Sequence, residues 1–559
     1  MVIARLFFEG CLLSLYLCSH MNAVAGQNLT IPSGRWRKHT SNLTRTQREG
    51  LAFGAAVPLS KANISQANPD LPRLSHVTSV YALLALQDYY SGNTTWRDAV
   101  VGGLVAGTQG RTGFYSANRE SSENVNYWGL AFIYAFRAYK EQSLLEHAMD
   151  AWNLTYSSAY ITPSAEVSDS GAGRNISFVP SASCSGGTFA GGVFSRQDLH
   201  NDTYINAVAV APFMALSAYL SEETNNTDTA YGQAAQLSLN FIIDHLWNGT
   251  IVYDGIYSDS CNLSEPAPWT LNQAWFVEGL SVWANVTRND TLTKLLETVV
   301  SSVATYPAWI SSASDGIIND HTRDPSLKGE QQILKGVLVR GLAEARLRNP
   351  DTDLARYIEA FIHVQLNAIL DFARGRGPND SRYARSWDLS PASAFDAGGN
   401  VAAVDVLNSA FTLVSPSTFV NGTSKGHVKS PKTSAIAGGV VGGVVAAVVA
   451  VIAVTVLVCR RRRRTKAAGI NNGPGSDAVE PFFSRIAHNP IASSKWGRIN
   501  EAYELPSHPA SLAPPASDAN YDRGVGHEPF EVAEIPSIVQ RSNSFLQGRH
   551  GEQPPRYEE

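Results

Sequence analysis

The sequence predicts an all-α protein in which a toroid of inner and outer helices precedes a single transmembrane helix and a disordered cytosolic tail. Two kinds of helical segment alternate over the first 414 residues, and a charge-free run of 24 residues follows them. The residues after that run are rich in Pro, Ser, Asn and Gly. They have too little apolar periodicity to fold alone.

The overall composition narrows the classes of protein to which the chain can belong. Of its 559 residues, 44% are hydrophobic and 17% are charged, which excludes wholesale disorder and allows a large core. The net charge of −5 gives no reason to expect nucleic acid as a partner. Five cysteines exclude a disulfide-dense scaffold, and the motifs CxxC, HExxH and GxxxxGKS/T are absent. We therefore expect no metal and no cofactor.

Residues 1–25 have the features of a secretory signal peptide. Arg5 is the early cation, the apolar run Cys11–Cys18 follows, and Ala23-Val24-Ala25 forms an A-x-A cleavage site. The alternative is an uncleaved membrane anchor, but the apolar run is short for a bilayer span. We expect cleavage after Ala25.

Residues 435–458 are a stronger apolar segment. These 24 uncharged residues are long enough to cross a hydrocarbon core of about 30 Å, and five arginines follow at Arg460–Arg464. Such a run marks the cytosolic side of a membrane and argues against a GPI signal, whose apolar tail ends the chain. The alternative, a buried core helix, does not account for the arginines.

The two apolar segments predict a type I protein of the plasma membrane with five parts. These are the signal peptide 1–25, an extracellular domain 26–414, a Ser/Thr/Pro stalk 415–434, the transmembrane helix 435–458 and the disordered tail 459–559.

Sequons for N-glycosylation support this orientation, because all 14 precede the transmembrane segment and none follows it. The acceptors are Asn28, Asn42, Asn63, Asn93, Asn153, Asn175, Asn201, Asn225, Asn248, Asn262, Asn285, Asn289, Asn379 and Asn421.

The first kind of helical segment in the extracellular domain is apolar nearly all round, so it must be buried on every face. Five such segments start about 60–80 residues apart: 125–139, 204–220, 272–283, 334–345 and 401–414. The second kind is amphipathic, with one apolar stripe. It comprises residues 144–152, 230–247, 291–306 and 353–374.

Alternation of the two kinds is what a toroid of inner and outer helices requires, with a pocket formed by the loops at one rim. A large helical bundle has the same periodicity and remains the alternative.

Several motifs within the helical segments resemble those of glycoside hydrolase family 76. Together they cover residues 76–412, and their order and spacing make the resemblance specific. They are NYWGLA at 126–131, CSGGT at 184–188, NAVAVAPFMALSA at 206–218, DGI at 254–256, NQAW at 272–275, EGL at 278–280 and KG…RGL at 335–342.

The resemblance implies an (α/α)6-type barrel that acts on α-1,6-mannan. Members of the family are fungal and bacterial, and fungal members are implicated in building or remodelling the cell wall. The implied partner is therefore cell-wall mannan or another α-mannoside.

Glycosidic cleavage requires two carboxyl groups, one to protonate the leaving oxygen and one to attack the sugar or activate water. In the family this pair is two adjacent aspartates shortly before the Trp-Gly of an inner helix. Counted back from Trp128, those positions hold Glu123 and Asn124. Glu123 is the candidate catalytic residue. Asn124 cannot transfer a proton, and it can equally be the N-cap of the helix.

Other acidic residues could supply the second carboxyl group. Asp254 and Asp259 flank one loop, and Glu278 lies in a predicted inner helix, where pairing with Arg340 is the structural alternative.

Three aromatic residues are candidates for binding sugar rings by stacking: Tyr127, Trp128 and Trp275. At helical spacing, aromatic residues also serve commonly as core.

These observations leave two hypotheses for the function. The first is a membrane-anchored mannan hydrolase or transglycosidase. The second is a catalytically impaired mannan-binding protein with a signalling or trafficking tail.

Two further features concern the cysteines and the C-terminus. Cys184 and Cys261 are the only extracellular cysteines left after signal cleavage, so we expect them to form a disulfide.

The chain ends in a PPxY motif made by Pro554, Pro555 and Tyr557. This motif predicts binding to a WW-domain ubiquitin ligase, although so short a motif also arises by chance.

Overall fold

The computed structural model describes residues 29–32, 34–62, 64, 71, 74–108, 121–180, 184, 187–225, 229–264, 269–310, 315–319 and 333–415. The predicted signal peptide, stalk, transmembrane helix, tail and PPxY motif lie outside these residues, as do the acceptors Asn28, Asn63 and Asn421. In the part of the chain that is described, no helix combines the length and apolarity needed to cross a bilayer.

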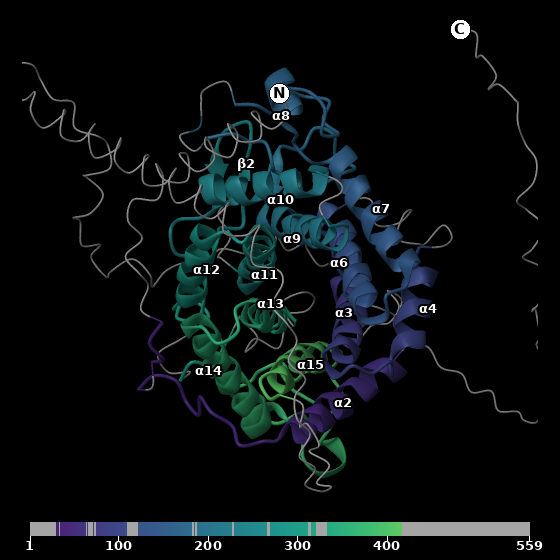
Figure 1. The fold of residues 1–559 in the computed structure, drawn as a ribbon, viewed down its shortest axis with the longest axis vertical. Coiled ribbons are helices and arrows are strands. Elements are labelled where there is room, and N and C mark those ends of the chain that lie inside the picture. Colours follow the sequence, from purple (N-terminus) through teal and green to yellow (C-terminus); the bar gives the residue numbers. More distant parts are fainter. Residues whose placement is uncertain are drawn as a thin grey trace, which may run out of the picture. The chain divides into compact units, whose positions relative to one another are not determined.

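Twelve helices of the described residues form two concentric rings (Figure 1). The inner ring consists of α3 (Leu74–Ser91), α6 (Ser122–Tyr139), α9 (Ala207–Glu223), α11 (Thr270–Thr287), α13 (Leu334–Arg348) and α15 (Ala397–Thr412). The outer ring consists of α2 (Arg45–Lys61), α4 (Arg97–Gly107), α7 (Gln142–Ser158), α10 (Thr229–Phe241), α12 (Asp290–Val303) and α14 (Asp353–Ala368).

Inner and outer helices alternate strictly along the chain, as the sequence predicts for a toroid. Each inner helix packs against the next, and α15 packs against α3, so the inner ring is closed. The five predicted buried segments are the helices α6, α9, α11, α13 and α15. The four predicted amphipathic segments are α7, α10, α12 and α14.

Three helices of the rings, the short helix α8 (Pro163–Ser168) and a small sheet were not predicted. The inner helix α3 was overlooked although residues 77–86 are almost entirely buried, and the outer helices α2 and α4 carry glycines that obscure an apolar stripe. Residues 204–206, expected to begin a helix, are instead the strand β1 (Tyr204–Asn206).

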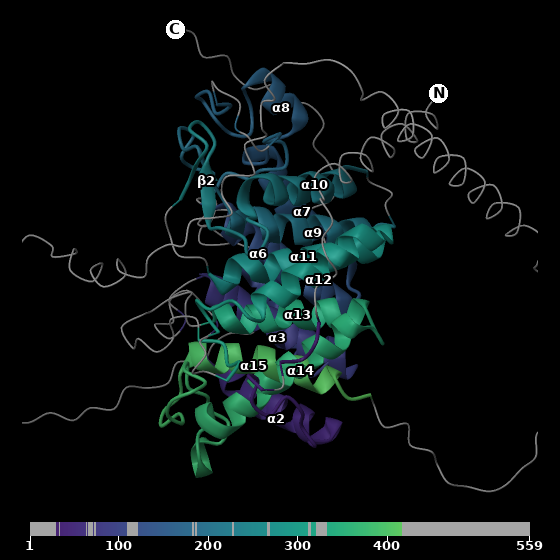
Figure 2. The ribbon, with the colours of Figure 1, turned by 90° about the vertical axis from the view of Figure 1, so that its left-hand side faces the viewer.

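The sheet lies beside α8 (Pro163–Ser168) at one end of the described region (Figure 2). Strand β1 pairs antiparallel with β2 (Gly255–Tyr257), which pairs antiparallel with β3 (Asn262–Leu263). The π-helical turns η1 (Ile242–Leu246) and η3 (Ile369–Ala373) end α10 and α14, and the 3-10 turn η4 (Gly377–Asn379) follows η3.

The inner ring closes through side chains between its first and last helices. Gln87 of α3 donates to Asn408 of α15 at 2.8 Å, and Asn408 donates to the carbonyl of Leu83 at 2.9 Å. Arg48 of α2, which is 2% exposed, donates to the carbonyl of Ala410 at 2.8 Å. Residues more than 300 positions apart in the chain are thereby joined.

Glycines allow neighbouring inner helices to approach closely. A Cβ added at Gly336 of α13 would lie 2.6 Å from the Cα of Ala402 in α15. One added at Gly341 would lie 2.5 Å from the carbonyl oxygen of Ala274 in α11. Only glycine, which has no Cβ, allows these helices to pack so closely.

We expect Gly336→Ala to lower the free energy of unfolding by about 1–3 kcal/mol, because α13 and α15 would have to separate. The matched control is Gly102→Ala in α4, where a new Cβ would meet nothing within 4 Å and helix propensity favours alanine. Chemical denaturation of the two variants checks this, and equal stabilities would contradict it.

A buried polar network on the axis of the ring links all six inner helices. Glu278 of α11 accepts from the hydroxyls of Tyr134 in α6, at 2.5 Å, and Tyr219 in α9, at 2.8 Å. Arg340 of α13 faces Asp405 of α15, with Nη1 and Oδ1 separated by 3.7 Å.

A second ion pair extends this network to α3. Arg137 of α6 lies 3.0 Å from Glu344 of α13, and its guanidinium stacks over the ring of Tyr89 in α3 at 4.6 Å. Arg348 also contacts Glu344, at 2.8 Å, and Glu222, at 2.8 Å. The charged groups of the ring interior therefore compensate one another.

The carboxyl groups of the network have different environments. Burial alone would raise the pKa of Glu344, but the two guanidinium groups of Arg137 and Arg348 hold it below its usual value. Burial raises the pKa of Glu278, and it raises the pKa of Asp405 to about 6 despite the opposing charge of Arg340. Ionisation of Asp405 is therefore less favourable in the folded state than in the unfolded chain.

The raised pKa of Asp405 predicts a pH dependence of stability. The group ionises near 3.8 when unfolded and near 6 when folded, so its contribution to the free energy of unfolding falls by up to about 3 kcal/mol as pH rises from 4 to 7. We expect Asp405→Asn to match the wild type at pH 4 and to gain relative stability by pH 7.

Urea denaturation across this pH range measures the difference between the two proteins. Asp98→Asn is the control, since the side chain of Asp98 is 97% exposed, and its difference from the wild type should stay constant. If the stability difference between Asp405→Asn and the wild type also stays constant with pH, the Asp405 carboxyl group is not the cause of the pH dependence.

Candidate functional site

The helix that carries the predicted catalytic residue is anchored at its first turn. The side chain of Ser121 caps α6 by accepting from the amide of Asn124, and the hydroxyl of Ser122 donates to the carbonyl of Phe194 at 2.6 Å. Asn124 is therefore the third residue of the helix and not its N-cap, contrary to the structural alternative that the sequence suggested.

Glu123 lies in a polar cluster at the start of α6. Its Oε2 accepts from the hydroxyl of Ser195 at 3.4 Å, and Ser195 accepts from the amide of Asn206 at 3.2 Å. Asn206 ends β1 and also caps α9, because its Oδ1 accepts from the amide of Ala209 at 3.0 Å. The position of Glu123 thus depends on the sheet and on the start of the next inner helix.

Asp254 is attached to the same strand from the other side. Its Oδ2 accepts from the hydroxyl of Tyr204 at 2.6 Å, and its Oδ1 accepts from the amide of Asn272 at 3.3 Å. Tyr204 and Asn206 are the two ends of β1, so one short strand positions both carboxyl groups.

The other two carboxyl candidates lie elsewhere. Asp259 is exposed and accepts from Thr203 at 2.9 Å. Glu278 is buried, with 1% of its surface exposed, but its hydrogen-bond partners are Tyr134 and Tyr219 and not Arg340, which faces Asp405. Asp254 is therefore the best candidate for the second carboxyl group.

Tyr127 and Trp275 form an aromatic pair on the ring axis, with ring centroids 4.3 Å apart. Together with Tyr134 and Arg340 they line a narrow cavity of about 10 Å³, roughly the space of one water. Glu123 precedes Tyr127 by four residues, and residues at this spacing share a helix face. The carboxyl group therefore lies one turn from the aromatic pair, on the same face of α6.

Trp128 has a different environment from its neighbour. Both residues are almost fully buried, but Trp128 does not line the axial cavity and packs instead against Tyr81 and Phe132, with ring centroids 6.3 Å and 6.0 Å away. The structure thus places Trp128 in the core around α6 and brings only Tyr127 and Trp275 together.

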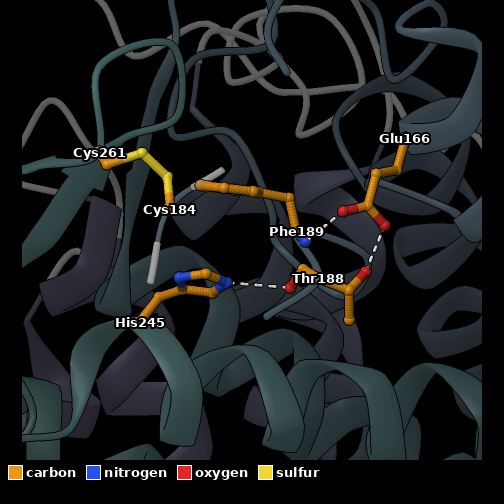
Figure 3. Close-up of a disulfide and its surroundings, with 6 residues drawn as sticks. All are labelled: Glu166, Cys184, Thr188, Phe189, His245 and Cys261. Atoms are coloured by element: carbon orange, nitrogen blue, oxygen red, sulfur yellow. Dashed lines mark hydrogen bonds between the residues drawn. A yellow bond between two sulfur atoms is a disulfide. The ribbon is translucent and has the colours of Figure 1, made fainter. Parts of the chain in front are cut away.

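The predicted disulfide between Cys184 and Cys261 is present (Figure 3). It joins the segment before Thr188 to the β2–β3 hairpin. Glu166 of α8 accepts from the hydroxyl of Thr188 and from the amide of Phe189, the latter at 2.7 Å. The Nε2 of His245 lies 3.0 Å from the carbonyl oxygen of Thr188 and donates to it, because a carbonyl oxygen can only accept. Burial lowers the pKa of His245, which favours the neutral ring.

A roomier cavity, of about 420 Å³, lies between α2 and the segment 374–383. Its lining includes Arg374, Asp380 and Tyr383, but neither Glu123 nor the aromatic pair. We place the candidate site on the ring axis because Tyr127 and Trp275 line the cavity there and Glu123 lies one helical turn before Tyr127. Among the described residues, no group of three or more His, Cys, Asp or Glu is arranged to hold a metal ion.

The sequence did not reveal two residues that hold the site together, Ser195 and Asn206. Asn206 caps the apolar helix α9, and a polar residue at such a position is the signal that could have identified it. Ser195 lies in the loop before β1 and carries no such signal. Asn126 is a polar residue inside the buried helix α6, and it donates to the carbonyl of Ala209 at 3.1 Å.

Eleven of the 14 sequons lie among the described residues. Asn289 and Asn379 are half-buried, and the other nine are exposed: Asn42, Asn93, Asn153, Asn175, Asn201, Asn225, Asn248, Asn262 and Asn285.

Solved structures share the fold at low sequence identity. An inactive variant of an α-1,6-mannanase from Salegentibacter sp. HEL1_6, in complex with α-1,6-mannotriose, superposes with a TM-score of 0.52 at 14% identity, covering 66% of this chain and 99% of that one. Dfg5 from Chaetomium thermophilum, in complex with glucosamine, gives a TM-score of 0.53 at 15% identity, covering 70% of this chain and 94% of that one.

Sequence comparison points to the same family over part of the chain. No curated protein matches the chain. The family model described as Glycosyl hydrolase family 76 matches residues 180–417, which extend from the disulfide segment through β1 to the last inner helix. Glu123 and Tyr127 precede the matched residues, so their assignment rests on the motif in α6. Residues 180–417 are thus similar to glycoside hydrolase family 76, and the toroid is shared with solved structures that include an α-1,6-mannanase.

Proposed function

We propose that the chain acts on α-1,6-linked mannan at the outer surface of a fungal cell, by hydrolysis or transglycosylation. The observation that carries this proposal is that Asp254 accepts from Tyr204 at one end of β1, while Ser195 links Glu123 to Asn206 at the other end. Glu123 also lies one helical turn before Tyr127 of the Tyr127–Trp275 pair. A mannosyl unit would stack at the mouth of the narrow axial cavity, with the aromatic pair as its floor.

The two carboxyl groups would divide the chemistry between them. One protonates the leaving glycosidic oxygen, and the other attacks the anomeric carbon or activates a water. The hydroxyl of Tyr204 and the amide of Asn272 both donate to Asp254 and fix the position of its carboxyl group. A fixed carboxyl group suits the nucleophile or base, and Glu123 would then be the acid.

A second candidate function is mannoside binding with impaired catalysis. It is favoured by Asn124, which stands where the family carries its second aspartate. The Salegentibacter variant, whose two consecutive aspartates are both asparagine, is inactive and yet is in complex with α-1,6-mannotriose. Loss of the aspartates is thus compatible with a bound mannoside in that protein.

Replacing Glu123 by Gln separates these functions. If Glu123 is the acid, turnover of α-1,6-mannan should fall about 10²–10⁴-fold while affinity for α-1,6-mannotriose is retained. Product release by chromatography and calorimetric titration of the trisaccharide measure the two quantities. Asp259→Asn is the matched control and should behave as the wild type.

Three outcomes are distinct in this experiment. Wild-type binding without product would favour the second function. Full turnover by the Glu123→Gln variant would remove Glu123 from the mechanism, and absence of binding by the wild type would contradict both functions.

We also propose that residues 26–414 face the cell exterior and that the chain is anchored by residues 435–458. Support comes from the apolar segments, the arginine run and the distribution of sequons. We expect the full chain to lose mass on treatment with a peptide N-glycosidase. Protease added to intact cells should remove the toroid and spare an epitope tag on the tail. If the protease digests the tail of intact cells instead, the chain has the opposite orientation.

A further inference from the structure

A pocket of about 290 Å³ lies on the surface where the ring closes, away from the candidate active site. It is bordered by α2, α3, α15 and the loop between α3 and α4. Its lining includes Glu49, Phe53, Ser91, Asn93 and Trp96.

One wall of this pocket is an exposed aromatic stack. The ring of Phe53 is 47% exposed and lies over Trp96, with ring centroids 5.3 Å apart and planes inclined by 23°. Trp96 is fixed from behind, because its indole nitrogen donates to Gln87 at 2.6 Å. The stack thus presents a rigid apolar face to the pocket.

The loop that borders the pocket is held in place by Asp88. Its carboxylate accepts from the amides of Thr95, at 3.0 Å, and Trp96, at 2.7 Å, and its carbonyl accepts from the amide of Asn93 at 3.1 Å. Asn93 itself is exposed and begins the sequon Asn-Thr-Thr. A glycosylation acceptor is therefore fixed at the wall of an aromatic pocket.

We propose that an N-linked glycan on Asn93 places its first N-acetylglucosamine in this pocket, against Phe53. In the attachment step, the amide nitrogen of Asn93 loses a proton and bonds to the anomeric carbon of an oligosaccharide, displacing the polyprenyl diphosphate that carries it. The apolar face of the sugar ring covers Phe53, and its hydroxyl and acetamido groups lie near Glu49 and Ser91. This inference rests on the proposed extracellular placement of the domain.

Because the glycan is covalently attached to Asn93, even a weak contact is enough to keep its first sugar in the pocket. Stacking of one sugar ring is a small interaction, but a tethered ligand has a high effective concentration at a nearby surface. The pocket volume of about 290 Å³ leaves room for one sugar ring.

The test is a double-mutant cycle on the full chain produced in a secreting host. Mass spectrometry first measures the occupancy of Asn93 and of Asn201, an exposed sequon outside the pocket lining. The midpoint of thermal unfolding is then compared for the wild type, Asn93→Gln, Phe53→Ala and the double variant. Thr95→Ala, which removes the sequon and keeps Asn93, is the second route to the unglycosylated loop.

We expect Asn93→Gln to lower the midpoint by about 1–3 °C, and Asn201→Gln to leave it unchanged. In the Phe53→Ala background the effect of Asn93→Gln should disappear. Enzymatic trimming to a single N-acetylglucosamine should preserve the wild-type midpoint, because only the first sugar reaches the pocket.

Several results would overturn the inference. An unoccupied Asn93 beside an occupied Asn201 would refute the glycan while leaving the extracellular placement intact, whereas absence of glycan at every sequon would refute both. An effect of Asn93→Gln that persists without Phe53 would show that the glycan acts without entering the pocket.

Discussion

The rest of the structure depends on the charge compensation at the axis of the inner ring. Arg137, Arg340 and Arg348 lie there with Glu278, Glu344 and Asp405, and removal of such groups from water is unfavourable unless each finds its partner. The partners come from different helices, so the charges fix the relative height of those helices. The glycines of α13 then allow the approach that brings these side chains within reach.

This network also sets the floor of the candidate site. Arg340 and Tyr134 belong to the network and at the same time line the narrow axial cavity. The aromatic pair Tyr127–Trp275 lies against them, and Glu123 lies one helical turn before Tyr127 in α6. Because Glu278 and Asp405 are nine-tenths or more buried in the network, they are held as structural groups, and the accessible chemistry falls to the carboxyl groups near β1.

Much of the fold could be predicted because inner helices are apolar on every face and outer helices on one. The same property limits prediction of the site. Tyr127 and Trp128 are adjacent in a helix that is buried all round, so apolarity does not reveal which residue faces the axis; the structure places Tyr127 there and Trp128 in the core. The disulfide was predictable from the count of cysteines. The contacts of Glu123 were not, since Ser195 and Asn206 lie more than 70 residues away in the chain.

The surface where the ring closes differs physically from the other junctions between inner helices. Neighbours such as α9 and α11 follow each other in the chain, whereas α3 meets α15 only after the whole domain is assembled, so this junction carries the largest loss of chain entropy. Gln87, Asn408 and Arg48 hold it with buried hydrogen bonds. Phe53 and Trp96 extend it outward as an aromatic surface that protein side chains leave half-covered. Any group that covers this surface binds only the closed ring, and it therefore stabilises the closed ring that positions the carboxyl groups of the site.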